Sequence, residues 1–343
     1  ACTAPQSPTA QIDHTSWAVL YERPEPADAS LVDLRAVGDV MLGRGVAAAL
    51  ERTGGDPFAA IDTLLAGDLR IGNLESPLTD RRDALRPGPY RLLAAPERAT
   101  TLAARFSAVS LANNHAYDAG PAGLADSLAM LGNAGIAAVG AGTTSDQAYT
   151  PQIYTINGVR VALLAFNDVL DPADGAAARL APVLAAAEEW RDPDTLACNI
   201  AECTHVRAWL GPAALAAVQT ARTQAKVVVV LTHWGVEYAA APSVRQRAWA
   251  ERLVVAGADL VIGAHPHVLQ PVEPIRAGAR TGIVAYSLGN AVFDGPADPQ
   301  RNSGAVLRVL LDAQGVALVA AAPVDPTGGR PQPISLDTPD AQT

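Results

Sequence analysis

Residues 257–268 read GADLVIGAHPHV, and this stretch decides the fold class. Its apolar run, residues 259–262, has the length and composition of a buried strand. Two histidines, His265 and His267, follow that run within five residues, with Pro266 between them. Ligands of open α/β sheets bind outside the carboxyl ends of the strands. We therefore interpret the stretch as a strand that delivers two imidazoles to a turn where both can face a pair of metal ions.

The same arrangement recurs along the chain, where short apolar runs are separated by segments of helical period. The predicted strands cover residues 31–37, 69–72, 108–112, 159–166, 227–231, 259–262, 283–286, 306–311 and 316–320. One predicted helix covers residues 121–133, and a second opens with Ser243 and Gln246 at capping-box spacing and stops at Gly257. Strands that alternate with helices indicate an α/β protein. Only residues 312–315 separate the last two strands, which predicts an antiparallel hairpin at a sheet edge.

The periodicity divides the chain into three parts. Residues 1–30 are rich in proline and lack a periodic pattern, so we expect a flexible N-terminal tether. One domain then covers residues 31–325, with an insertion at about residues 168–223, where the strand pattern weakens. Residues 326–343 form a C-terminal tail.

Composition limits the partners of the protein. The chain has 343 residues, of which 49% are hydrophobic and 17% charged, so it can bury a large core and does not have the composition of a disordered chain. Its formal net charge is −10 and it has no basic run, which argues against nucleic acid as a partner. Lys226 is the only lysine. We expect an anionic substrate, a small molecule or a polymer, to be held by arginine or by a metal ion.

The N-terminus and two further cysteines bear on location. No apolar stretch reaches the roughly 18–20 residues that a membrane-spanning helix needs. Ala1 and Cys2, followed by a polar run, resemble the end of a bacterial lipobox, and the alternative is an incidental free cysteine. We expect an exported protein at the cell surface or in the periplasm, either anchored through a lipid on Cys2 or free. Cys198 and Cys203 lie five residues apart, which predicts a local disulfide.

Ligand-type side chains follow six of the predicted strands. In chain order they are Asp39; Asn73 and Glu75; Asn113, Asn114, His115 and Asp118; His233; His265 and His267; and Asn290. Singly, Asp39 is typical of a helix cap and His233 of a buried core histidine. Carboxylates, amide oxygens and imidazoles together are ligands of Zn, Mn, Fe or Ni rather than of Mg or Ca. Their convergence favours a site for one or two divalent metal ions, with Zn, Mn or Fe expected.

The motifs, in this order, resemble the CapA family of poly-γ-glutamate capsule proteins, a branch of the calcineurin-like metallophosphoesterase superfamily. The matching segments are GDVM (38–41), GNLE (72–75), ANNHAYDAG (112–120), HWGVEY (233–238), GADLVIGAHPHV (257–268) and YSLGN (286–290). The segments from residue 233 onward are the most specific. The resemblance implies a four-layer αββα sandwich of the metallophosphoesterase type, with a two-metal cleft at the carboxyl ends of the strands.

The resemblance also implies roles for individual residues. Asp39 and His267 would belong to one metal site, and Asn114, His233 and His265 to the other. The bridging position would be filled by Glu75, or by Asn73. His115 would be the general acid and Asp118 its orienting partner. Arg44, Glu237 and Asn290 are candidates for substrate binding, and Arg301 is a further arginine that could bind an anion.

One departure from the superfamily pattern leaves two functions open. The first motif usually reads Asp-x-His, but this chain has Met41, so the first metal site lacks a nitrogen ligand. The first hypothesis is an exported metal-dependent hydrolase that acts on a phosphate ester or on a polyanionic, poly-γ-glutamate-like envelope polymer. The second is a non-catalytic metal-dependent factor that binds such a polymer and guides its synthesis or export within a membrane complex. His115 favours the first hypothesis, and Met41 favours the second.

Overall fold

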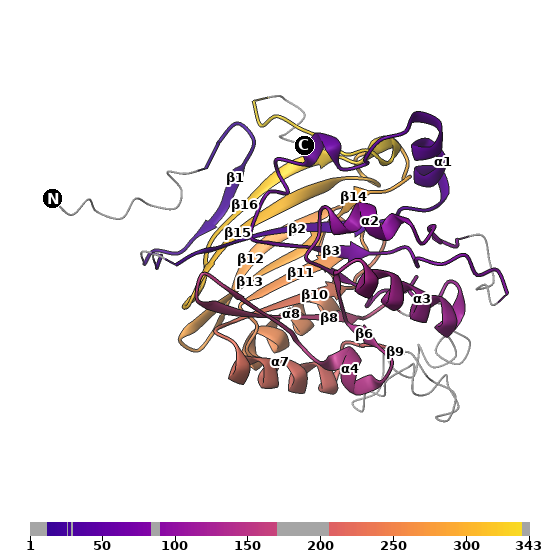
Figure 1. Cartoon of the computed structure of the whole chain (residues 1–343). Helices are drawn as coiled ribbons and strands as arrows, with labels where there is room; N and C mark the ends of the chain where they lie inside the picture. Colours follow the sequence, from indigo (N-terminus) through magenta and orange to yellow (C-terminus); the bar gives the residue numbers. More distant parts are fainter. Residues whose placement is uncertain (1–11, 26, 29, 84–89, 170–205, 338–343) are drawn as a thin grey trace.

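Two β-sheets pack face to face, and helices cover the outer face of each (Figure 1). This computed structural model describes residues 12–25, 27–28, 30–83, 90–169 and 206–337. The order of layers is helix, sheet, sheet, helix. The predicted four-layer αββα sandwich is therefore confirmed.

The larger sheet carries the first ligand-bearing strands. Within the described residues it has nine strands: β1 (Ala18–Glu22), β2 (Val32–Val40), β3 (Leu69–Leu74), β4 (Ala108–Ser110), β5 (Ala137–Val139), β14 (Asn290–Val292), β15 (Gly304–Asp312), β16 (Gly315–Asp325) and β17 (Gln332–Pro333). The order is β1-β16-β15-β2-β3-β4-β5, while β14 pairs with β2 and β17 with β16. Strands β2 to β5 and β14 are parallel to their neighbours, except where β2 meets β15. Their carboxyl ends therefore lie at one edge.

The smaller sheet carries the histidines. Its six strands are β7 (Gln152–Ile156), β8 (Val159–Asn167), β10 (Val227–His233), β11 (Leu260–Ala264), β12 (Leu269–Ala277) and β13 (Arg280–Leu288), in the order β12-β13-β11-β10-β8-β7 within the described part of the chain. Strands β8, β10, β11 and β13 are parallel. A separate antiparallel pair is formed by β6 (Ala141–Gly142) and β9 (Val206–Arg207).

Helices close the sandwich on both sides. On the larger sheet pack α1 (Arg44–Thr53), α2 (Arg98–Ala103) and α3 (Gly120–Asn133), and on the smaller sheet α4 (Ser145–Tyr149), α7 (Pro212–Gln224) and α8 (Val244–Ala256) (Figure 1). Two short 3₁₀ helices are η2 (Ala59–Ile61) and η3 (Thr327–Gly329). Helix α8 begins with the predicted capping box, in which Ser243 and Gln246 bond each other's backbone, and ends at Gly257.

The hydrophobic core explains why β10 is apolar along its length. Val227, Val229 and Leu231 face the other sheet, whereas Val228 and Val230 face the helices α7 and α8. A parallel strand buried on both faces needs a continuous apolar run rather than an alternating one. The run therefore places β10 in the centre of the fold and brings His233 to its end.

Several predicted boundaries differ from the structure. The hairpin β15–β16 forms as predicted, but it is not at the sheet edge, because β1 pairs with β16. Strand β1 lies in the segment predicted as a tether, and Trp17 before it is buried. Strand β17 likewise occupies the predicted tail and pairs with β16. Helix α7 lies in the predicted insertion, but it packs in the core through Val218. Cys2, Cys198 and Cys203 lie outside the described residues.

Candidate metal centre

The carboxyl ends of strands from both sheets meet at one buried site. Asp39 lies near the end of β2 and is paired in register with Asn290 of β14. This close approach requires glycine, because a Cβ on Gly38 would lie 1.9 Å from the carbonyl oxygen of Gly289. The Asp39 backbone N–H donates to that same oxygen over 2.9 Å. The two motifs that contain these glycines therefore hold the strand ends together.

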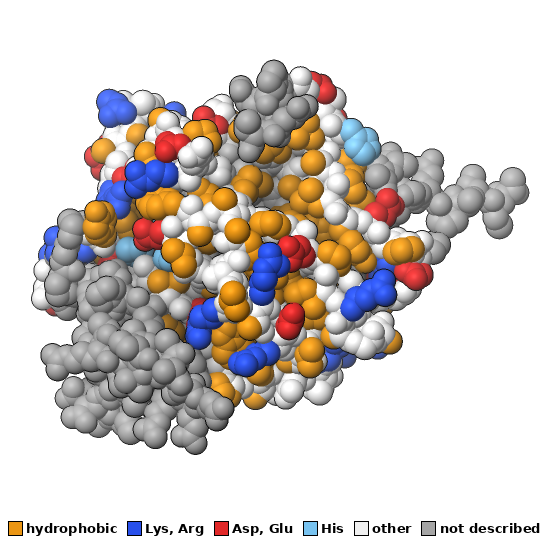
Figure 2. Space-filling view, turned by 180° about the vertical axis from the view of Figure 1, so that it is seen from behind, with side chains coloured by type: hydrophobic (Ala, Val, Ile, Leu, Met, Phe, Trp, Pro, Cys, Tyr) orange, Lys and Arg blue, Asp and Glu red, His pale blue; other side chains and the backbone are white. Residues whose placement is uncertain are grey.

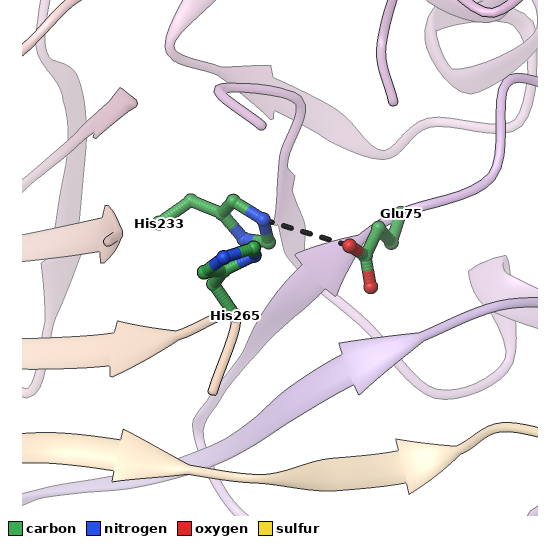
Figure 3. A group of neighbouring side chains, drawn as sticks. All are labelled: Glu75, His233 and His265. Carbon is green, nitrogen blue, oxygen red and sulfur yellow. Dashed lines mark ion pairs between the residues drawn. The ribbon is translucent and has the colours of Figure 1, made fainter. Parts of the chain in front are cut away.

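One group of potential ligands consists of Glu75, His233 and His265. One ligand atom from each lies within 4.8 Å of the others, and all three residues are buried. Glu75 follows β3, while His233 ends β10 and His265 follows β11. Figure 3 shows the two imidazoles side by side, with a ring nitrogen of His233 directed at the Glu75 carboxylate. His233 Nε2 lies 3.5 Å from Glu75 Oε1.

A second group consists of Asp39, Glu75 and His267, again with ligand atoms within 4.8 Å of one another. His267 Nδ1 lies 3.3 Å from Asp39 Oδ2. Glu75 belongs to both groups, so its carboxylate stands between two sets of imidazole and carboxylate donors. That is the position which a carboxylate bridging two metal ions occupies.

The Glu75 carboxylate is the strongest structural indication of a metal ion. Both of its oxygens are buried and have no hydrogen-bond partner among the described residues. Burial first, and then the nearby charge of Asp39, raise the pKa of Glu75 well above its usual value. A buried carboxylate without partners is costly to the fold, whereas coordination of a cation compensates it.

The histidines have the protonation states that metal ligands need, with one exception. Burial, together with the neighbouring imidazoles, lowers the pKa of His233 and of His265 well below the usual value, so both are neutral at pH 7. His265 Nδ1 is buried without a hydrogen-bond partner. Burial would also lower the pKa of His267, but its hydrogen bond to Asp39 and the Glu75 charge raise it to about 9. These donors are compatible with a divalent metal ion.

Asparagine side chains orient the ligands. Asn114 Oδ1 lies 2.7 Å from His233 Nε2, so the predicted ligand Asn114 is at the same ring nitrogen as Glu75. Asn73, the alternative bridging residue, contacts two of the ligands through its amide nitrogen: its Nδ2 donates to Asp39 Oδ1 over 2.8 Å and lies 3.2 Å from His233 Nδ1. Asn113 Nδ2 in turn donates to Asn73 Oδ1 over 3.1 Å. Asn73 therefore orients the ligands Asp39 and His233, and Asn113 holds Asn73 in place.

His115 lies at the edge of the site, held by Asp118. Its Nδ1 is 2.9 Å from Asp118 Oδ2, and its Nε2 is 3.9 Å from Glu75 Oε1. Asp118 is fully buried, and the same oxygen accepts the backbone N–H of Leu92 over 2.7 Å. A carboxylate at Nδ1 keeps the proton on that nitrogen and leaves Nε2 directed at the site.

The three predicted substrate-binding residues have different surroundings. Arg44 forms a two-point ion pair with Asp294, with Nη2 at 2.5 Å and Nε at 3.1 Å, so its guanidinium is already engaged. Asn290 is buried, and its Oδ1 lies 2.9 Å from His267 Nδ1, which makes it an orienting residue for that imidazole. Glu237 is exposed on the loop after β10.

Met41 is buried in the hydrophobic core cluster that also contains Val46 and Leu50 of α1. Its sulfur accepts the backbone N–H of Gly43 over 3.2 Å. The group around Asp39 therefore has one imidazole, that of His267, where the group around His233 has two.

The backbone is strained around the site. Five non-glycine residues of the described chain have a positive φ, and four of them follow ligand-bearing strands, three on loops and Arg44 as the first residue of α1. Those four are Arg44 (45°), Tyr238 (63°), His265 (96°) and His267 (60°). Left-handed conformations at such residues cost of the order of 1–3 kcal/mol each and cluster at functional sites.

Arg207 in β9 was missed in the sequence, because a two-residue strand has no periodic signal. Its guanidinium is buried, stacks over the ring of Tyr117 at 4.6 Å, and donates to the carbonyl oxygen of Asn113 over 2.9 Å. It thus supports the loop that carries Asn114 and His115.

Comparison with known proteins identifies the family. The sequence model of the family described as "Bacterial capsule synthesis protein PGA_cap" matches residues 33–295. The chain belongs to this family. It is 31% identical over 329 residues to the "PGA biosynthesis protein CapA" of Bacillus subtilis, covering 94% of this chain and 79% of that protein. It is 33% identical over 309 residues to the "Capsule biosynthesis protein CapA" of Bacillus anthracis, covering 87% and 68%.

Solved structures with a similar fold are more distant. A putative 5'-nucleotidase from Staphylococcus aureus, in complex with α-ketoglutarate, is 14% identical with a TM-score of 0.49, covering 87% of this chain and 55% of that one. A hypothetical protein from Thermus thermophilus is 14% identical with a TM-score of 0.47, covering 85% and 99%. The PGA_cap chain studied here has no helix among its described residues that is long and apolar enough to span a membrane.

Proposed function

We propose that this PGA_cap protein is a metal-dependent hydrolase that cleaves a phosphate ester or a γ-glutamyl bond in a polyanionic envelope polymer. The observation that carries the proposal is the position of Glu75, which both ligand groups share and which His115 borders. A site built only to bind a carboxylate polymer needs cations, but it does not need an imidazole held ready to transfer a proton.

The chain would hold one ion with Asp39, Glu75 and His267. It would hold the other with Glu75, His233 and His265, to which Asn114 adds an amide oxygen. A bound divalent ion supplies Lewis acidity and, in the case of zinc, lowers the pKa of a bound water to about 7.

His115 is the residue that moves a proton. Asp118 accepts from its Nδ1, so Nε2 is the nitrogen that faces the site. In the doubly protonated imidazolium form, Nε2 gives its proton to the leaving oxygen or nitrogen, and the neutral ring keeps its other proton on Nδ1. The side chain of His115 is 12% exposed, whereas that of Asp118 is fully buried. The leaving group can therefore reach the imidazole from outside while the orienting carboxylate remains shielded from water.

Met41 supports a second candidate function, a binding factor without turnover. Because its sulfur faces the Gly43 N–H, the ion at Asp39 has a weaker set of donors. Such a site would bind the carboxylates of a poly-γ-glutamate chain and guide the chain during its synthesis or export. In this case His115 would have no proton to transfer.

The two candidates are separated by a substitution at His115. His115→Gln should keep the wild-type metal content, because His115 is in neither ligand group, and should lower hydrolysis by about 10²–10⁴-fold. The matched control is His14→Gln, at an exposed histidine near the N-terminus. Assays with a nitrophenyl phosphate, a phosphodiester and γ-glutamyl peptides should be run after metal loading. Wild-type turnover in the variant, or no turnover by the fully loaded wild type, would contradict the enzyme proposal.

We also propose that the protein acts at the cell envelope, together with a membrane-bound capsule-synthesis complex. The support is that its relatives in Bacillus subtilis and Bacillus anthracis are named as PGA and capsule biosynthesis proteins. Lipid attachment at Cys2 would anchor it there. Fractionation of cells that express the wild type and Cys2→Ser tests both points: the wild type should be found in the membrane fraction, and the variant should be released from it.

A further inference from the structure

Outside the ligand groups, the aromatic ring of Tyr238 and the guanidinium of Arg301 lie next to each other at the edge of the site. Tyr238, on the loop after β10, is 38% exposed although it is a large aromatic residue. The guanidinium carbon of Arg301 lies 4.7 Å from the centre of its ring. Tyr238 also lies next to the candidate metal site, because its ring centroid is 6.1 Å from that of His267.

The backbone ties this pair to the ligands. The Tyr238 N–H donates to the carbonyl oxygen of Pro266, the residue between His265 and His267, over 2.8 Å. Tyr238 adopts a φ of 63°, a left-handed conformation that a tyrosine does not adopt without cost. The strained backbone thus fixes an exposed ring beside the histidine turn, where the hydrophobic effect alone would favour burial of that ring.

Arg301 is fixed in the same way through its neighbours. Asn302 is buried, and its Oδ1 accepts from Asn290 Nδ2 over 2.8 Å, while Asn290 contacts His267. The Ser303 N–H donates to the carbonyl oxygen of His267 over 3.2 Å. The position of Arg301 therefore follows that of His267, even though its own side chain is exposed.

The charge of Arg301 is available for a ligand. Arg44, on the same rim, is neutralised by Asp294, whereas among the described residues no ion pair is recorded for Arg301. A guanidinium that lies over a ring face directs its N–H groups along its own plane, where they can bind a planar carboxylate at two points. Figure 2 shows the molecule from behind the view of Figure 1, with basic and acidic side chains interspersed among hydrophobic ones on that face.

We propose that Tyr238 and Arg301 form a subsite that binds a substrate carboxylate next to the Asp39–Glu75–His267 group. This inference rests on the proposed function, which supplies the polyanionic substrate, and it adds the residues that select its chemistry. In a γ-linked glutamate chain each residue carries a free carboxylate, so one carboxylate can lie on Arg301 while a neighbouring bond lies at the ligand groups.

The test is binding of a γ-linked glutamate oligomer and of inorganic phosphate to the metal-loaded full chain, measured by calorimetry. Arg301→Ala should weaken oligomer binding about 10- to 100-fold, the range for a charge-assisted hydrogen-bond pair. The affinity of Arg301→Lys for the oligomer should lie between those of the wild type and of Arg301→Ala, because lysine keeps the charge but lacks the planar guanidinium. Tyr238→Phe should bind within about twofold of the wild type and Tyr238→Leu should not, because stacking needs only the ring.

The matched control is Arg252→Ala. Arg252 is exposed and stacks over Trp249 at 5.0 Å on α8, so this variant removes the same kind of pair away from the site. Metal content should equal that of the wild type in every variant, because none of these residues is in a ligand group.

Each result decides between the two proposals. If Arg301→Ala binds the oligomer as tightly as the wild type, the subsite is wrong and the proposed function stands. If Arg301-dependent binding is found but the fully metal-loaded wild type turns over none of the substrates, the subsite stands and the proposed hydrolase function is wrong. Loss of phosphate binding alone would overturn the carboxylate assignment. A wild type that binds no oligomer at all would overturn both.

Discussion

Replacing Glu75 with glutamine should change stability in opposite directions with and without metal. In the metal-free protein both Glu75 oxygens are buried without partners, and the raised pKa shows that the folded state disfavours the ionised form. A carboxyl with a raised folded-state pKa destabilises the fold at pH values above its unfolded value. Glu75→Gln removes that charge at nearly constant volume, so the metal-free variant should be more stable than the metal-free wild type.

The size of the effect follows from the burial of the group. An unsatisfied buried acceptor costs about 1–3 kcal/mol, and more if it is charged. For 343 residues, an unfolding entropy of about 2.1 cal/mol/K per residue corresponds to about 1.4 °C per kcal/mol, so we expect a rise of about 1–4 °C at pH 7. The gain should shrink as the pH falls toward 4.5, the usual pKa of this carboxyl, because wild-type Glu75 is then protonated.

With metal the order should reverse. A metal ion at one hundred times its Kd stabilises the folded protein by about 2.7 kcal/mol, which corresponds to a rise of about 4 °C in the unfolding temperature here. Glu75→Gln removes a coordinating carboxylate from both groups, so the variant should lose that rise. Thermal unfolding of chelated and metal-loaded samples measures both effects. The control is Glu51→Gln, at an exposed residue of α1. A less stable metal-free variant that keeps the full metal shift would refute the assignment of Glu75 as a shared ligand.

Three further predictions concern the same centre. His265→Ala should lower the metal content per chain, because it removes one of two neutral imidazoles from its group, and elemental analysis at wild-type levels would contradict this. Metal binding should release a proton from His267, since its pKa is raised to about 9, so metal affinity should rise with pH up to about 9; calorimetry in buffers of different ionisation enthalpy measures the proton count. Met41→His should raise occupancy of the Asp39 group by adding a nitrogen donor, and adding Asp39→Ala should abolish the gain, as measured by metal titration.

The position of the site could be predicted from the sequence because local rules place it. The apolar run of β10 is buried on both faces, and His233 directly follows that run, so burial and position at the strand end were both encoded within a few residues. The capping box at Ser243 was likewise a local signal.

Non-local contacts could not be predicted in this way. Strand β1 has no marked alternation of its own, and its pairing with β16 joins segments about 300 residues apart. The same applies to Arg44, whose position five residues after Asp39 suggested a substrate contact, whereas the fold places Asp294, 250 residues away, within hydrogen-bond distance. Pairing of charges across the fold depends on tertiary geometry, for which a single sequence carries no periodic signal.

Strain and uncompensated charge at the centre have a common explanation. His265 combines a left-handed backbone with an N–H that donates to Asp39 Oδ2 over 3.1 Å and an imidazole that belongs to the Glu75 group. A relaxed backbone would withdraw one of these contacts, so the strain keeps both ligand groups in place. The large apolar core between the sheets can tolerate that local cost, because the unfavourable conformations lie outside the strands, on loops and at the first residue of α1. Metal binding then compensates the buried carboxylates, which is why we expect the loaded protein, rather than the metal-free one, to be the stable form.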